Sequence, residues 1–205
     1  MDSLAVLTGQ HTMLMPLHMD HHDGLVEAVK DGQLWNLWWT AIPTPEMMTE
    51  EIQRRLHLLS EGLMQPYTVF RLSPQGRQQI VGMTTLMNID RTHRVAEIGS
   101  TWYAQSAQGS NVNPEAKLLL LREAFENQGF RRIELRTHSM NTHSRRAIEK
   151  LGAQYEGTLR RHQIIPNGTI RDTVVYSILD IEWPAVKAGL EHRLNAPEDR
   201  HSPDV

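Results

Sequence analysis

The feature that most constrains the fold of this chain is a block of three extended segments with short connections between residues 67 and 103. The first segment, 67–72, is rich in β-branched and aromatic side chains, and Ser73-Pro-Gln-Gly76 after it is a turn sequence. Two more segments with the composition of strands follow at 79–89 and 94–103. Three strands joined in this way predict a meander in the middle of the chain.

Helices are expected on both sides of this block in the sequence. Thr44-Pro45 is a helix-start signal, and apolar residues follow it at spacings of four, four, three and four, as on one face of an amphipathic helix. That face consists of Met48, Ile52, Leu56, Leu59 and Leu63. The remaining expected elements are a strand at 13–17, a helix from Asp20 to Val29, a helix at 114–127, a strand at 132–138, a helix at 142–151, a hairpin of strands 153–165 and 169–179 over Pro166-Asn167-Gly168, and a helix at 182–193.

The order of these elements predicts an α/β (α+β) fold. Strands first come in a block and then alternate with helices, which favours a mixed sheet covered by helices. A length of 205 residues suits one domain with a full core, and there is no internal repeat and no linker rich in proline, glycine or serine. We therefore expect a single domain over residues 1–194, followed by a polar, disordered tail over residues 195–205.

Composition argues against several functions. A net charge of −3 offers no broad basic field, so we expect neither nucleic acid nor an anionic membrane as a partner. The chain has no cysteine, which rules out disulfides, thiolate zinc sites and acyl transfer through an enzyme thioester. Histidines such as His18, His21 and His22 lack a matching carboxylate framework, so no metal is expected. No signal peptide and no apolar run of membrane-spanning length is found, and we expect a cytoplasmic protein.

One strand–loop–helix junction carries the most chemical information. The strand predicted at 94–103 is followed by a polar loop over 105–113 and then at once by the helix predicted at 114–127. Backbone N–H groups of such a loop point outward at the positive end of the helix dipole, which makes a diphosphate site. The alternative is an ordinary capped helix start, which the same residue types also favour.

Two neighbouring features fit a ligand site at this junction. Gly99 lies inside a strand pattern, where glycine often marks a bulge. A bulge would splay this strand from its partner and free N–H groups to grip a pantetheine arm and polarise a thioester carbonyl. Asn141 and Ser144 lie one helical turn apart where the strand at 132–138 gives way to the next helix. The alternative role for this region is capping of that helix by Asn141 or Thr142.

Four short motifs follow one another in a specific order. They are Ala96-Glu-Ile-Gly-Ser-Thr-Trp102, Gln108-Gly-Ser-Asn-Val-Asn-Pro-Glu-Ala-Lys117, Asn141-x-x-Ser144 and Glu149-Lys-Leu-Gly152. With these motifs, residues 13–179 resemble a GNAT N-acetyltransferase of the RimJ/RimL-type branch. The resemblance implies a mostly antiparallel central sheet, splayed near its middle and flanked by helices. It also implies transfer of an acetyl group from acetyl-CoA to a primary amine, either a protein N-terminal α-amine or a small-molecule amine, by direct attack in a ternary complex.

The resemblance also assigns the cofactor contacts. The family's pyrophosphate signature starts at Gln108, with Asn111 and Asn113 where the family has glycine or alanine. Asparagine enters left-handed backbone conformations readily, so Asn111 is expected to replace a glycine there. The residues expected to bind acetyl-CoA are Thr101, Trp102, Tyr103, Gln108, Gly109, Ser110, Asn111, Val112, Asn113, Asn141 and Arg146. Arg145 is the alternative partner for a CoA phosphate.

The reaction needs a base, because a lysine-like amine has a pKa of about 10.4 and attacks a thioester only when neutral. Glu97, just before the expected bulge, is the candidate base, and a surface glutamate facing solvent is the alternative. Backbone N–H groups of Thr101 to Tyr103 would hold the oxyanion. The family's acidic tyrosine is matched by Ile148, so Ser144 is the candidate for protonating the thiolate. Trp35, Trp38 and Trp39 resemble the family's substrate-pocket segment, although such residues also serve as core.

Two other functions stay open on the sequence. The altered loop at 108–113 is compatible with a non-catalytic acyl-CoA-binding sensor or interaction domain, and an α/β interaction domain without any cofactor is the third reading. The sequence names no single acceptor. Because GNAT-like domains often dimerise, a homodimer is a further expectation of the resemblance.

Overall fold

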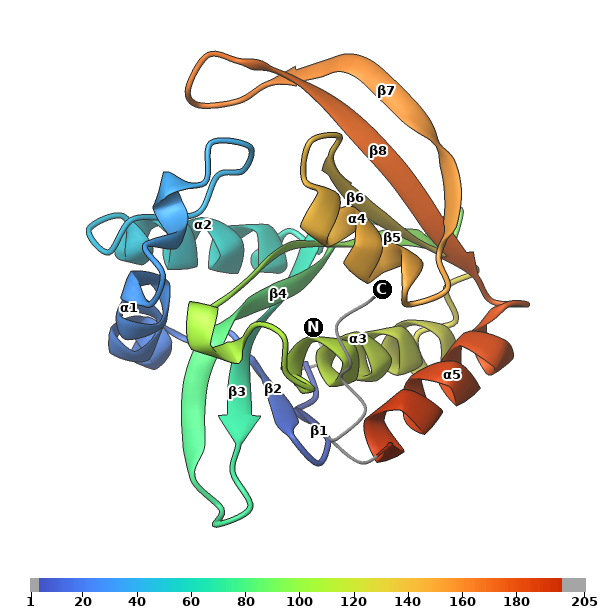
Figure 1. Ribbon diagram of the computed structural model, residues 1–205, viewed down its shortest axis with the longest axis horizontal. Helices are drawn as coiled ribbons and strands as arrows, with labels where there is room; N and C mark the ends of the chain where they lie inside the picture. Colours follow the sequence, from blue (N-terminus) through green and yellow to red (C-terminus); the bar gives the residue numbers. More distant parts are fainter. Residues whose placement is uncertain (1–3, 197–205) are drawn as a thin grey trace, which may run out of the picture.

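The computed structural model describes residues 4–196 (Figure 1). Its strands are β1 (Leu7–Thr8), β2 (Thr12–Pro16), β3 (Met64–Leu72), β4 (Gln78–Asp90), β5 (Val95–Tyr103), β6 (Arg132–His138), β7 (Gln154–Ile164) and β8 (Ile170–Leu179). Its α-helices are α1 (His22–Lys30), α2 (Met48–Ser60), α3 (Val112–Arg122), α4 (Thr142–Glu149) and α5 (Trp183–Asn195). The meander β3–β5 and the later alternation of helices with strands confirm the predicted order of elements.

Within residues 4–196 the strands form one mixed sheet, in the order β1-β2-β3-β4-β5-β6-β8-β7. The strands β5 and β6 are parallel, and every other neighbouring pair is antiparallel. The predicted mixed, mostly antiparallel sheet is therefore confirmed.

The sheet is splayed between β5 and β6. These two strands pair only through Val95–Glu97 and Arg132–Glu134. Beyond that point β5 stays paired with β4 as far as Tyr103, and β6 stays paired with β8 as far as His138. The facing edges of β5 and β6 therefore separate after Glu97, which confirms the predicted splay.

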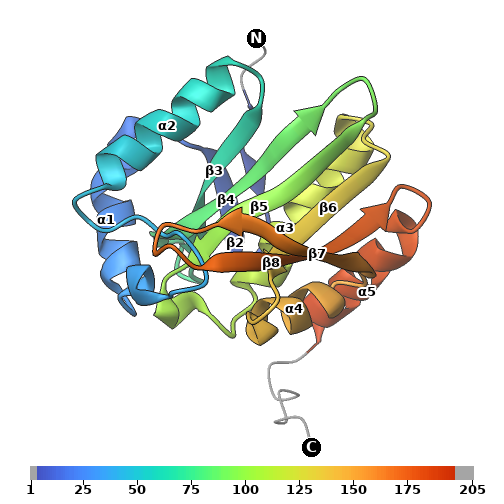
Figure 2. The ribbon, with the colours of Figure 1, turned by 90° about the horizontal axis from the view of Figure 1, so that it is seen from above.

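Helices cover both faces of the sheet. The helices α1 and α2 pack on β3 and β4, whereas α3 lies on the other side with α5 against it (Figures 1 and 2). The leucines Leu118–Leu121 are all buried because α3 is enclosed between the sheet and α5. No helix within residues 4–196 is both long enough and apolar enough to cross a membrane.

Two predicted helix starts differ from the structure. The helix α2 begins at Met48, and Thr44-Pro45 instead opens a turn in which the Met48 N–H donates to the Pro45 carbonyl over 3.3 Å. Leu63 consequently lies beyond the helix and is exposed. Asp20 is not a cap, because it lies within a 3-10 helix, where its own N–H donates to His18 Nδ1 over 3.3 Å.

A third difference concerns α3, which begins at Val112 rather than at Pro114. Pro114 then occupies the first turn, where N–H groups have no intrahelical partner, so its missing N–H costs nothing. The tail predicted at 195–205 lies outside the described residues, apart from Asn195 and Ala196, and Asn195 is the last residue of α5.

Candidate active site

A β-bulge marks the point where β5 leaves β6. Met83 of β4 faces Trp102 and Thr85 faces Gly99, so β5 has one residue more than β4 in this interval. Ser100 takes up the distortion with a φ of 47°, in the left-handed region. The sequence predicts a bulge at Gly99, and the structure has it at the residues that directly follow.

Two buried cationic side chains brace this bulge, one from each face of the sheet. From α2, the guanidinium of Arg55 donates to the Ser100 carbonyl over 3.1 Å and to Thr85 Oγ1 over 2.6 Å. From α3, Lys117 Nζ donates to Thr101 Oγ1 over 3.1 Å and to Thr84 Oγ1 over 3.4 Å. Contacts on both faces hold the bulged backbone in one conformation.

The two cations are neutralised differently. Arg55 is 3% exposed and has its own counterion, since its Nε lies 2.6 Å from Glu51 Oε1. Lys117 is 6% exposed, and its recorded partners within residues 4–196 are the two hydroxyls alone. Burial lowers the pKa of Lys117 to about 7. Sequence reasoning missed both residues, although a charged residue within the apolar runs Ile52–Leu56 and Ala116–Leu121 is a usable signal.

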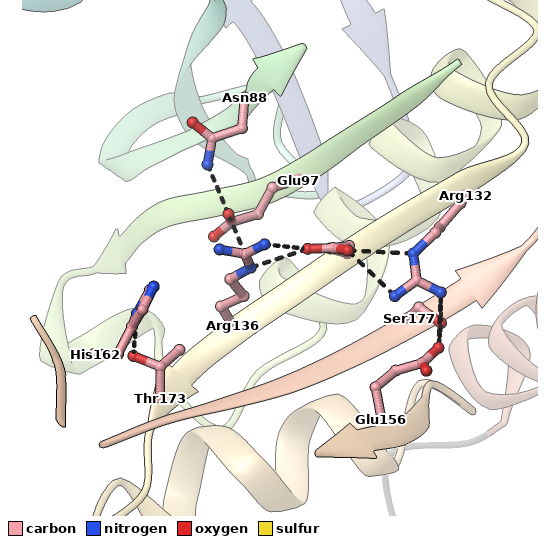
Figure 3. Close-up of polar contacts among 9 residues, drawn as sticks. Asn88, Glu97, Arg132, Arg136, Glu156, His162, Thr173 and Ser177 are labelled. Atoms are coloured by element: carbon pink, nitrogen blue, oxygen red, sulfur yellow. Dashed lines mark hydrogen bonds and ion pairs between the residues drawn. The ribbon is translucent and has the colours of Figure 1, made fainter. Parts of the chain in front are cut away.

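Glu97 is a buried carboxylate on the residue where the splay begins. Its side chain is held by Asn88, whose Nδ2 donates to Glu97 Oε2 over 2.8 Å, and Arg136 Nε lies 3.6 Å from the same oxygen (Figure 3). Burial raises the pKa of Glu97 and is the largest influence, with the nearby Glu134 adding to it and Asn88 and Arg136 opposing it. The alternative of a solvent-facing glutamate is wrong, because Glu97 is 8% exposed.

The positive charge beside Glu97 is shared with other carboxylates. Arg136 donates to Glu134 Oε2 over 2.6 Å and 2.9 Å, and Arg132 donates to Glu134 Oε1 and, over 2.7 Å, to Glu156 (Figure 3). Because Glu134 engages both arginines, Arg136 only partly offsets the effect of burial on Glu97.

Gly99 makes room for the Glu97 side chain. A Cβ atom at position 99 would lie 2.9 Å from Glu97 Oε1 and 3.0 Å from Met87 Sδ, closer than ordinary van der Waals contact. The glycine is therefore needed less for backbone freedom than for the space that the carboxylate occupies.

The loop between β5 and α3 is tightly ordered. Gln108 Nε2 donates to the Tyr103 carbonyl over 3.1 Å, and the Val112 N–H donates to Ser110 Oγ over 3.3 Å. The expectation that Asn111 takes a left-handed conformation is wrong, because its φ is −71° and the left-handed residue is Gly109, with φ 72°. The loop turns at Gly109, so Asn111 can open the right-handed helix without making a side-chain cap.

Asn141 and Ser144 lie together at the start of α4, as predicted. Asn141 Oδ1 accepts the Ser144 N–H over 3.0 Å, so Asn141 caps the helix. The hydroxyl of Ser144 has no hydrogen-bond partner within residues 4–196, and neither does the exposed side chain of Arg146. Arg145 is occupied instead, because it donates to Tyr176 Oη and to the Ser139 carbonyl.

The tryptophan segment after α1 touches the far end of the molecule. Asn167, in the β7–β8 turn, donates from Nδ2 to the Trp38 carbonyl over 2.9 Å, so the hairpin and the α1–α2 segment meet (Figures 1 and 2). The Trp38 ring lies edge-on to Trp39 at 5.6 Å and to His138 at 5.4 Å. Trp35 packs on the core instead and is separate from this cluster.

Two predicted cofactor residues carry buried polar atoms that stay unpaired within residues 4–196. These atoms are Trp102 Nε1 and Tyr103 Oη, next to the bulge, and burial raises the pKa of Tyr103. Because buried polar groups normally have a partner, such atoms favour a ligand nearby. In the same range, no group of three or more His, Asp or Glu side chains is arranged to hold a metal ion.

Comparisons with known proteins agree on one family. A family model described as an acetyltransferase (GNAT) domain matches residues 11–154. A curated relative from Bacillus subtilis strain 168, named as a candidate ribosomal N-acetyltransferase (YdaF), is 34% identical over 108 residues. That stretch covers 53% of this chain and 58% of the relative, so the chain matches little more than half of that protein's length.

Solved structures extend the similarity over nearly the whole chain. A crystal structure of a GCN5-related N-acetyltransferase from Brucella melitensis has 32% identity and a TM-score of 0.81, and the match covers 97% of this chain and 88% of that one. RimJ from Mycobacterium smegmatis, in complex with CoA-disulfide, has 23% identity and a TM-score of 0.75, with 89% of this chain and 88% of that chain covered. At that identity RimJ shares the fold.

Proposed function

The chain belongs to the GNAT acetyltransferase family, and from this premise we propose that it transfers an acetyl group from acetyl-CoA to a primary amine. The observation that carries the proposal is the combination at one place of the splay, the braced bulge and the buried carboxyl of Glu97. In this proposal the acceptor attacks the thioester directly in a ternary complex, without an enzyme-bound acetyl group.

Acetyl-CoA is the proposed acetyl donor, and three groups of residues support a site for it. The first turn of α3 and the preceding residues Gln108–Asn113 would take the diphosphate, because N–H groups at a helix start bind anions. Trp102 and Tyr103 have buried polar atoms in need of a partner. Asn141 would contact the pantetheine, and Arg146, which is exposed, would pair with a phosphate.

Glu97 is the proposed general base. The amine nitrogen attacks the thioester carbon, a C–N bond forms, the C–S bond breaks, and the amine proton passes to Glu97 directly or through water. A carboxyl whose pKa is raised by burial is a stronger base than an ordinary glutamate, which suits this role.

The remaining charge is handled on both sides of the splay. Backbone N–H groups of Thr101–Tyr103 would stabilise the oxyanion, since preorganised donors at such a position lower the barrier. The departing thiolate takes up a proton with the help of Ser144, which would donate it or position a water. A free thiol has a pKa of about 8.5, so this last step places little demand on the enzyme.

The acceptor is proposed to be a protein N-terminal α-amine or a small-molecule amine. Trp38 and Trp39 would form an apolar wall beside it, and the contact of Trp38 with Asn167 closes that side of the site. We further propose that residues 1–194 act as a single domain in the cytoplasm, without a metal, nucleic acid or membrane partner, and with a homodimer as the expected assembly.

Release of free CoA thiol, measured across a panel of amines, tests the proposal. Binding of acetyl-CoA is followed separately through the shift in melting temperature, because a ligand of the native state stabilises it. Turnover with at least one amine is the expected result. A melting shift with no turnover on any amine would instead favour the non-catalytic acyl-CoA sensor, and the absence of both would overturn the assignment of the site.

A further inference from the structure

His138 is a buried residue at the end of the splay. It is the last residue of β6 and is 5% exposed. Side chains alternate along a strand, so His138 lies on the same face as Glu134 and Arg136, and Glu134 is paired in register with Glu97. His138 therefore lies on the face of the sheet that carries the proposed base, beside the edge of β6 that β5 has left.

The protonation of the ring follows from one hydrogen bond. The Met140 N–H donates to His138 Nδ1 over 3.0 Å, so Nδ1 carries no proton. Burial, reinforced by Arg171, lowers the pKa of His138, and the neutral ring then has its hydrogen on Nε2. This Nε2–H group is buried and has no hydrogen-bond partner within residues 4–196.

The recorded surroundings of His138 leave this donor without an oxygen. Trp38 presents an aromatic ring, which is at best a weak acceptor. The Trp38 carbonyl accepts from Asn167, and Thr173, opposite His138 on β8, is engaged by Arg171 and His162. A buried donor left in this way costs free energy, so its presence beside an aromatic wall favours a partner on the substrate.

We propose that His138 is a specificity-determining residue whose Nε2–H group binds a carbonyl oxygen of the acceptor, next to the amine that is acetylated. The acceptor class that fits is an α-amino amide, such as the first residue of a peptide. This inference rests on the proposed function, because it assigns a contact in the same acceptor site.

Chemistry narrows the acceptor in two ways. An N–H donor offers nothing to an alkyl group, and binding the amine nitrogen itself would occupy the lone pair that must attack. A hydroxyl would bring a hydrogen that needs its own acceptor, and the two oxygens on the recorded neighbours, Trp38 O and Thr173 Oγ1, are already engaged. A carbonyl oxygen satisfies the donor and adds no further demand.

The test compares three acceptors that differ at one group: alaninamide, alaninol and isobutylamine, which carry a carbonyl, a hydroxyl and no oxygen, respectively. The value of kcat/KM is measured for the parent protein, His138→Phe, His138→Gln and the surface control His57→Phe. His138→Phe is expected to lower kcat/KM for alaninamide about 10-fold to 30-fold, the effect of one lost buried hydrogen bond, and to change isobutylamine less than about 3-fold. His138→Gln retains a donor and is expected to recover part of the loss.

Other outcomes separate the inference from the proposed function. Equal losses on all three acceptors, or a KM for acetyl-CoA that changes in parallel, would make His138 a structural residue and overturn the inference while leaving acetyl transfer intact. A selective loss on alaninol would replace the carbonyl by a hydroxyl and overturn the acceptor class. If the parent protein acetylates none of the three amines although acetyl-CoA raises its melting temperature, the proposed function fails and the inference fails with it.

Discussion

Replacing Lys117 by methionine should remove a pH dependence from the stability of the fold. The amine of Lys117 is buried under the bulge, and its recorded partners within residues 4–196 are the hydroxyls of Thr84 and Thr101. Its pKa falls from the ordinary 10.5 to about 7 because burial penalises the charged form. Methionine has a similar length and no charge, so the substitution removes the titration and keeps most of the volume.

The sign of the effect follows from which state holds the proton. Below pH 7 the amine is protonated in both the native and the unfolded chain, and folding bears the full cost of burying the charge. Between about pH 7 and 10.5 the unfolded chain keeps a proton that the native protein has released, so the free energy of unfolding rises with pH. The total difference between the two ends is on the order of 5 kcal/mol, at about 1.36 kcal/mol for each pKa unit.

Urea denaturation of the parent protein and of Lys117→Met at pH 7.5 and 9.5 measures this difference. The parent protein should gain about 2.5 kcal/mol of unfolding free energy relative to the variant over that interval, and all other titrations cancel in the comparison. Lys30→Met, at a half-exposed position on α1, is the matched control and should track the parent. A parent-to-variant difference that stays constant from pH 7.5 to 9.5 would mean that the native amine keeps its proton, and the account of Lys117 would be wrong.

Three further substitutions probe the site. Glu97→Gln should lower kcat about 100-fold to 10,000-fold while acetyl-CoA still raises the melting temperature, since an amide cannot accept the amine proton; in the parent protein, kcat/KM should rise with pH through a pKa above the 4.5 of an ordinary glutamate, and thiol release that is unchanged in Glu97→Gln would exclude it as the base. Gly99→Ala should reduce kcat by about 10-fold or more because its Cβ displaces the Glu97 carboxylate, whereas Gly189→Ala, with open space around the new atom, should have parent activity; equal rates in the two variants would contradict the packing argument. Ser144→Ala should cost less than about 10-fold in kcat, because a thiol leaving group of pKa about 8.5 needs little help, and a steady-state rate loss of more than about 100-fold would give Ser144 a larger role.

The regular part of the fold was accessible from the sequence. The strand predicted at 132–138 has the observed bounds of β6, and the β7–β8 hairpin turns at Asn167 and Gly168 as expected. These predictions rest on local signals, namely β-branched runs and turn residues, which act over a few residues. The helix starts failed where a local signal had two outcomes, as with Thr44-Pro45, which opens a turn and not the helix.

The site was accessible only in part. Glu97 and Gly99 lie in a recognisable motif, and both lie at the splay. Arg55 and Lys117 escaped prediction because each owes its role to a partner on another element, 30 to 45 residues away for Arg55 and 16 to 33 residues away for Lys117. The contact between Trp38 and Asn167 joins residues 129 positions apart, and neither local sequence pattern contains a signal for it.

The separation of β5 from β6 places two strand edges inside the protein. An edge at the rim of a sheet is open to any other extended chain, and natural sheets need charges, bulges or covering segments to protect such rims. The inner edges of β5 and β6 lie between helices on both faces, where a slender ligand fits and a foreign strand does not. The protein can thus offer unpaired backbone groups to a cofactor without offering a template for aggregation.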